Sequence, residues 1–411
     1  MMSSRAWFRA VLCLSTALMM AISWPLWVTG GDFPRVPWIG GTRLLPAWAS
    51  WVRFVVAMAA MIAASWPESW RFGDQISRPT LIVALAASTW MVLEDQFRLQ
   101  PWTYQFLLMG FAIAACPPGQ AARLCRWFVI AQYLHSGLSK LDHQFMNDMG
   151  RWFLFHGANA LGIKLKSWTG PRADAMIFAM PCWELAVAGL LAFGARRLGL
   201  FGAAAMHVAL IAILGPWGMD HSANVLIWNA ALLVEVVLLF GVGPARVVDP
   251  NPCGRAGRVF PVIAMSLIVA AALLPLGERS GYWDTWPSFG LYSSSEDRVI
   301  IGLSGEKADF SFPVRGWGWT PHAGIYVHRV DINLQAWSLR DRRVPLYPSG
   351  RALNGVAEAL GSRYVGQRAL WVRQDGRANR RSGLRQGTEL IGLDAVRRHA
   401  DTYWLNAHPA R

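Results

Sequence analysis

Nine long apolar segments, separated by short polar loops, constrain this chain more than any other feature of its sequence. They span about residues 8–28, 45–65, 79–94, 101–116, 125–140, 172–194, 198–215, 222–242 and 259–277. A helix that crosses the hydrocarbon core of a bilayer needs about 20 predominantly apolar residues. The pattern therefore predicts an all-α polytopic membrane helix bundle of about nine spans. It excludes an ordinary soluble enzyme and a disordered protein.

The density of charged residues changes near Gly277. Residues 278–411 carry charged side chains more often than residues 1–277 do. Stretches 298–304, 324–330 and 368–374 are rich in β-formers, whereas 349–363 and 393–405 have helical spacing. We therefore predict a transmembrane domain at 1–277 and a small soluble α+β domain at 278–411. The aromatic stretch 282–292 is predicted to lie at the membrane interface.

Arginines in alternate loops predict the orientation of the spans. They are Arg5, Arg9, Arg71, Arg78, Arg123, Arg126, Arg196, Arg197, Arg246, Arg255 and Arg258. Positive residues favour the cytoplasmic side, so the N-terminus is predicted to be cytoplasmic and residues 278–411 extracytoplasmic. The first segment also has the basic start of a signal peptide, and its cleavage would leave the remaining topology unchanged.

Lys140 stands out at the outer end of the fifth segment. The chain contains four lysines (Lys140, Lys164, Lys166 and Lys307), and arginine supplies nearly all of its other cations. A desolvated lysine can release its proton, which arginine does not do. Lys140 is therefore a candidate catalytic base, with His135 deeper in the same segment. The alternative is a lysine that extends to the surface or pairs with Asp142.

Ionisable residues inside apolar segments usually face a cavity or a partner because a charge in hydrocarbon is costly. Glu184 on the sixth segment and His207 on the seventh are the other candidate catalytic residues. Counting about 1.5 Å per residue places them at similar depth, so they are expected to be able to pair. Such a pair would either lock two helices together or transfer protons. Glu235 on the eighth segment is a weaker candidate.

Several polar and aromatic residues gather in the outer loops. Candidate cofactor-binding residues are Asp142, His143, Trp217, Asp220 and His221, and the loop 94–98 adds Glu94, Asp95 and Arg98. They would line a pocket or form a solvated rim. Their spacing predicts no metal site. In the C-terminal domain, arginines 340, 342, 343, 377, 380 and 381 would form either solvated surface or a patch for anionic lipid.

Two motifs carry a resemblance to a known family. The stretch 133–145, YLHSGLSKLDHQF, places Gly137 three residues before Lys140, and 180–202 contains Glu184 followed by glycine-spaced apolar residues and Arg196. Over about 80 residues the chain resembles the DoxX/MauE type of redox-associated membrane protein. With 94–106 it is more widely similar to HTTM and vitamin K-dependent carboxylase-like membrane domains.

The resemblance implies a four-helix core in a bacterial cytoplasmic (inner) membrane and association with a quinone. The principal hypothesis is a membrane protein that binds a quinone-like molecule near Lys140, His135, Glu184 and His207. The second is a non-catalytic partner or maturation factor for another membrane or periplasmic protein. The third is a carboxylase-like enzyme with Lys140 as base. In GLSKLD, Lys140 occupies the position of the lysine that is proposed as the base in the vitamin K-dependent carboxylase.

Overall fold

Each of the nine apolar segments contains a helix in the computed structural model. The model describes residues 4–28, 30–41, 46–66, 73–163, 169–241, 259–293, 296–306, 309–364 and 368–410. The nine segments correspond to α1 (Ser4–Ile22) with α2 (Trp24–Trp27), α3 (Ala47–Ala64), α4 (Gly73–Glu94), α5 (Pro101–Ala115), α6 (Pro118–Ser139), α9 (Pro171–Ala192), α10 (Arg196–Leu214), α11 (Ala223–Phe240) and α12 (Val259–Leu273). Arg71, Lys164, Lys166, Arg246, Arg255, Arg258 and Lys307 lie outside the described residues.

Seven helices of the described chain are long and apolar enough to cross a membrane. They are α1, α3, α4, α9, α10, α11 and the continuous stretch Val259–Ser280, which joins α12 to the 3-10 helix η3 (Leu274–Ser280). Helix α5 has only 15 residues, and α6 contains Arg123, Arg126 and further polar residues. The seven helices indicate a helical membrane protein, and the finer nine-span topology stays a prediction.

The chain folds into two compact units that are not continuous in sequence. The first comprises residues 1–22, 55–88 and 101–295, and the second comprises 23–54, 89–100 and 296–411. Helices α3 and α4 therefore contribute residues to both. The domain boundary that composition predicts after Gly277 stays a prediction.

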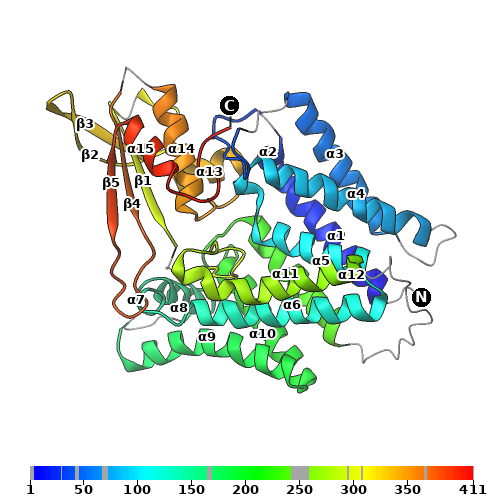
Figure 1. Cartoon of the computed structure of the whole chain (residues 1–411). Helices are drawn as coiled ribbons and strands as arrows, with labels where there is room; N and C mark the ends of the chain where they lie inside the picture. Colours follow the sequence, from blue (N-terminus) through cyan, green and yellow to red (C-terminus); the bar gives the residue numbers. More distant parts are fainter. Residues whose placement is uncertain are drawn as a thin grey trace. The chain divides into compact units, whose positions relative to one another are not determined.

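The second unit contains a five-stranded antiparallel sheet, in keeping with the predicted α+β domain. Its strand order is β2 (Val314–His322), β3 (Ile325–Ile332), β1 (Arg298–Ser304), β4 (Leu370–Asp375) and β5 (Gly387–Ile391) (Figure 1). Helices α13 (Leu334–Arg342), α14 (Gly350–Arg363) and α15 (Leu393–Ala400) accompany it. Helix α14 is buried along most of its length and contacts β1 and β4.

The aromatic stretch 282–292 is partly buried. Phe289 is fully buried and its ring lies 5.3 Å from that of Phe128 on α6 and 6.0 Å from that of Tyr104 on α5. Trp286 is also buried, whereas Tyr282 is exposed. The stretch therefore contributes Trp286 and Phe289 to the core of the first unit, and its place at the membrane interface stays a prediction. Burying a large aromatic side chain stabilises the folded protein more than leaving it exposed to water would.

Helices α6 and α9 pack closely because Gly137 has no side chain. A Cβ atom at Gly137 would lie 2.8 Å from Leu185 Cγ and 3.0 Å from the Pro181 carbonyl oxygen. Small residues at such crossings let two helix backbones approach each other in a membrane. The close approach occurs one turn before Lys140, so it sets the distance between the C-terminal end of α6 and the middle of α9.

We expect Gly137→Ala to destabilise the protein by about 1–3 kcal/mol, because the added methyl group must displace the Leu185 side chain and crowds the Pro181 carbonyl oxygen. Gly189→Ala on α9 is the matched control, since nothing lies within 4 Å of a Cβ atom at that position. Thermal unfolding of the two purified variants in detergent measures the difference. Equal midpoints for Gly137→Ala and the wild type would contradict the packing described here.

Candidate functional site

Lys140 is buried at the end of α6, and its ammonium group has three hydrogen-bond acceptors. Its Nζ donates to Glu184 Oε2 at 3.0 Å, to Ser136 Oγ at 2.6 Å and to the Ser136 carbonyl oxygen at 3.1 Å. An ammonium group has three N–H donors, so these three acceptors match its capacity. The predicted pairing of Lys140 with Asp142 is wrong, because Glu184 is its counter-ion.

Asp142 and His135 have other partners. Asp142 Oδ1 accepts from the Phe145 amide at 2.7 Å and so caps helix α7 (His143–Asn147), and its Oδ2 lies 3.2 Å from Arg279 Nη2. His135 Nε2 lies 2.8 Å from the Ala272 carbonyl oxygen of α12. The His135 contact joins α6 to α12, and the Asp142 contacts join the segment after α6 to α7 and η3.

His207 does not pair with Glu184, which corrects the second predicted pairing. Its Nε2 lies 2.7 Å from the Tyr133 hydroxyl of α6, and its Nδ1 lies 3.0 Å from Asn229 Oδ1 of α11. Asn229 Nδ2 donates to the Val225 carbonyl oxygen, so Oδ1 is the atom that faces His207. His207 therefore carries its proton on Nδ1, and the Tyr133 hydroxyl donates to Nε2.

Glu235 lies in a second polar contact inside the bundle. Gln105 Nε2 of α5 donates to Glu235 Oε2 at 2.6 Å, and Gln105 Oε1 accepts from Trp228 Nε1 at 3.0 Å. Glu235 and Gln105 are both almost completely buried. The second carboxyl oxygen of Glu235 is buried and has no hydrogen-bond partner among the described residues, and the same is true of Gln132 Oε1.

A groove of about 300 Å³ lies on α7 and helix α8 (Met149–Ala160), a helix that was not predicted from the sequence. Its lining combines polar and aromatic side chains: Asn147, Asp148, Arg151, Trp152 and Phe155. Helix α7 begins three residues after Lys140, so the residues that line the groove follow Lys140 closely in sequence. Trp152 and Phe155 are both exposed, as expected for residues that line an open groove.

The remaining candidate residues of the outer loops are spread over several environments. His143 and Trp217 are exposed, and Asp220 has a left-handed backbone with a φ of 47°. His221 is half-buried against the ring of Tyr292, and burial lowers its pKa. No contact described for these residues joins them to Asp142, so a shared cofactor-binding role stays a prediction.

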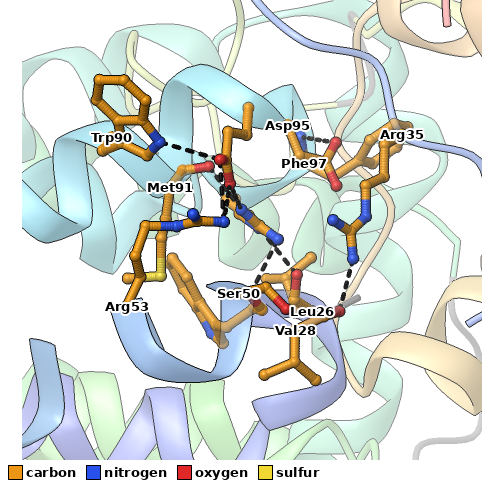
Figure 2. A network of polar contacts seen from close by, with 12 residues as sticks. Leu26, Val28, Arg35, Ser50, Arg53, Trp90, Met91, Asp95 and Phe97 are labelled. Carbon is orange, nitrogen blue, oxygen red and sulfur yellow. Dashed lines mark hydrogen bonds and ion pairs between the residues drawn. The ribbon is translucent and has the colours of Figure 1, made fainter. Parts of the chain in front are cut away.

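The loop after α4 forms a buried ionic network within the second unit (Figure 2). Glu94 accepts from Arg53 and Arg98, both at 3.1 Å, and from Trp90 Nε1 at 3.0 Å. Arg98 is completely buried and also donates to the carbonyl oxygens of Leu26, Trp27 and Met91, each at 2.9 Å. Burial lowers the pKa of Arg98, and the negative charges of Asp95 and Glu94 oppose that shift.

Asp95 connects this network to α13. Its Oδ2 lies 3.2 Å from Arg342 Nη1, and both side chains are buried. Arg342 also donates to the Pro34 carbonyl oxygen at 2.8 Å, and its guanidinium stacks 4.3 Å from the centre of the Phe33 ring. Arg342 is therefore not part of the solvated arginine surface predicted for 340–343. The loop 94–98 is likewise part of the core of the second unit and does not form a solvated rim.

Comparison with family models, with curated proteins and with solved structures found no match. The resemblance to the DoxX/MauE type consequently stays a prediction from the two motifs. The sequence alone did not indicate that Ser136, Tyr133, Asn229 and Gln105 take part in polar contacts. One signal was present: Tyr133, Ser136 and Lys140 recur every three or four residues, which places them on one face of a helix.

We expect Asp95→Asn to destabilise the second unit by about 3–5 kcal/mol, because it leaves Arg342 buried without its counter-charge. Asp32→Asn is the matched control. Asp32 also pairs with an arginine, Arg363, but both side chains are more than half exposed, so its loss should cost less than about 1 kcal/mol. Thermal unfolding in detergent compares the two variants. Similar losses of stability in both variants would show that the buried Asp95–Arg342 pair contributes no more than the exposed pair does.

Proposed function

We propose that the chain is a redox-associated membrane protein that binds a quinone-like molecule beside Lys140. The observation that carries the proposal is the buried Lys140–Glu184 ion pair at the end of α6. A buried ion pair contributes little net stability compared with apolar residues of similar volume. Its presence in an apolar bundle therefore favours a role in chemistry over a role in folding.

The contacts of Lys140 define what it would do. A quinone oxygen accepts hydrogen bonds, and its reduction requires protons. The ammonium group of Lys140 supplies a hydrogen-bond donor and a transferable proton, and Glu184 and Ser136 stabilise the charged form. Three acceptors around Nζ favour a lysine that begins as a proton donor, whereas a base would begin without the proton.

The groove on α7 and α8 supports a ligand of this class. Aromatic rings stack well against the flat faces of Trp152 and Phe155, and Asn147 adds a polar amide. A volume of about 300 Å³ is at the lower end of the range for small-molecule sites. We propose that the ring of the quinone lies in this groove with one oxygen directed toward Lys140.

We expect the purified protein to carry a quinone that mass spectrometry of the lipid extract detects. Lys140→Arg should retain it, because arginine keeps the positive charge, and Lys140→Ala should reduce it on the order of tenfold, equivalent to about 1.4 kcal/mol. Lys140→Arg should also weaken the pH dependence of the midpoint potential of the bound quinone, since a guanidinium does not release its proton.

Arg126→Lys is a control for the Lys/Arg exchange, because Arg126 lies at the other end of α6 and donates to the Leu239 carbonyl oxygen. It should leave the quinone content unchanged. If the purified chain contains no quinone and does not bind an added ubiquinone or menaquinone analogue, the proposed function is wrong.

A further inference from the structure

The hairpin of β2 and β3 in the second unit carries four large apolar side chains that are mostly exposed. Trp317 and Trp319 are 65% and 59% exposed, and Ile325 and Tyr326 are 64% and 72% exposed. Neighbouring exposed apolar side chains on a folded protein usually mark a surface that binds a partner. The hairpin is therefore a candidate interaction surface.

The aromatic side chains lie on one face of the hairpin. Trp317 and Trp319 are two residues apart on β2, so they share a face. His328 lies opposite Trp319 on the same face, and Tyr326 lies two residues from His328 on β3. The centre of the His328 ring is 6.0 Å from that of Trp317 and 5.8 Å from that of Trp319. His328 Nδ1 lies 2.9 Å from the Gly305 carbonyl oxygen, which fixes the ring between the two indoles.

The hairpin extends past its neighbour in the sheet (Figure 1). The pairing of β3 with β1 covers residues 329–331, whereas the pairing of β3 with β2 continues to His322 and Ile325 at the turn. A two-stranded hairpin is only marginally stable in water by itself. A surface that covers the aromatic side chains would therefore stabilise this end of the hairpin.

The chemistry of the hairpin indicates a lipid surface. Tryptophan and tyrosine are enriched at the boundary between membrane and water, because each combines an apolar ring with a polar N–H or O–H group. Residues 310–330 contain two arginines and two histidines and no aspartate or glutamate. Arg315 is exposed, whereas Arg329 pairs with Asp331. A basic segment is attracted to anionic headgroups, and seven helices of the described chain are long and apolar enough to cross a membrane.

The other way to bind a partner here is to add a strand, because β2 lies at the edge of the sheet. Two features of β2 disfavour it. Pro321 has no N–H donor, and a bulge interrupts the pairing with β3 between Val314 and Gly316. Edges that carry proline or a bulge resist pairing with another strand. The aromatic face of the hairpin is consequently a better binding surface than its edge.

We propose that the β2–β3 hairpin binds the headgroup layer of the membrane, with Trp317, Trp319 and Tyr326 buried among anionic lipids. The rings occupy the boundary between water and hydrocarbon, and Arg315 lies near the phosphate groups. Ile325 adds apolar area at the turn. The hairpin is thereby a membrane contact of the chain in addition to its apolar helices. It goes beyond the proposed function, because it involves neither Lys140 nor a quinone.

Photocrosslinking of the full chain in nanodiscs that contain an anionic phospholipid tests the proposal. With Tyr326→p-benzoylphenylalanine, irradiation joins residue 326 to the molecule beside it, and mass spectrometry identifies that molecule. We expect adducts with lipid. Replacing the anionic lipid by phosphatidylcholine should lower the yield several-fold, because the attraction of the basic residues is lost.

Trp404→p-benzoylphenylalanine is the matched control. Trp404 belongs to the same unit and is 74% exposed, but it follows the acidic Asp401 by three residues. We expect few lipid adducts at residue 404, because a carboxylate is repelled by anionic headgroups. An equal yield of lipid adducts at residues 326 and 404 would overturn the proposal.

The tryptophans are tested in the same crosslinking experiment. Trp317→Ser combined with Trp319→Ser should reduce the lipid adducts at residue 326 on the order of tenfold, because two large rings no longer leave water. Trp317→Tyr combined with Trp319→Tyr should retain most of them, since tyrosine also favours the interface, and this variant serves as the test if the serine variant does not fold. Adducts with protein in place of lipid, no adducts, or an unchanged yield in the serine variant would show that the proposal is wrong.

Discussion

A polar group that is buried away from water must find a partner, and this constraint organises both units of the protein. In hydrocarbon, no solvent competes for an unpaired ammonium or carboxyl group, so the cost of leaving it unpaired is several kcal/mol. Lys140 meets the constraint with three acceptors, and His207 meets it with a hydroxyl and an amide. The pairs join α6 to α9 and α6 to α10 and α11, so the partners of the polar groups also fix which helices are neighbours.

In the second unit the same constraint is met by arginine. Arg98 and Arg342 each reach backbone carbonyl oxygens as well as a carboxylate, which is possible because a planar guanidinium presents five donors. The arrangement joins the segment after α1, the loop after α4 and α13. These segments are far apart in sequence, which explains why the unit is discontinuous. A lysine at either position would leave several of those oxygens unsatisfied.

Apolar runs predicted the helices well, because the length and hydropathy of a segment are properties of the segment itself. The pairings could not be predicted in the same way. The depth of Glu184 was counted from the start of α9, but the first turns of that helix pack against α7 and α8, where Ala173 and Ile177 share a core with Phe145. The count therefore placed Glu184 beside His207, whereas it lies beside Lys140. Likewise β2 was missed, because Gly316, Gly318 and Pro321 disfavour a strand and are tolerated at the sheet edge that β2 occupies.

The contrast between the two units suggests why residue 140 is a lysine and not an arginine. Where a buried cation serves only to hold segments together, as in the network around Asp95, the chain uses arginine, whose proton is fixed. At the end of α6 it uses lysine, although an arginine would form a more directional pair with Glu184. The property that lysine adds is a proton that can leave. Ser136 and Glu184 stabilise the charged form, and Tyr133 lies on the same face of α6, two turns deeper. The choice of lysine at this position supports the proposal that Lys140 transfers a proton.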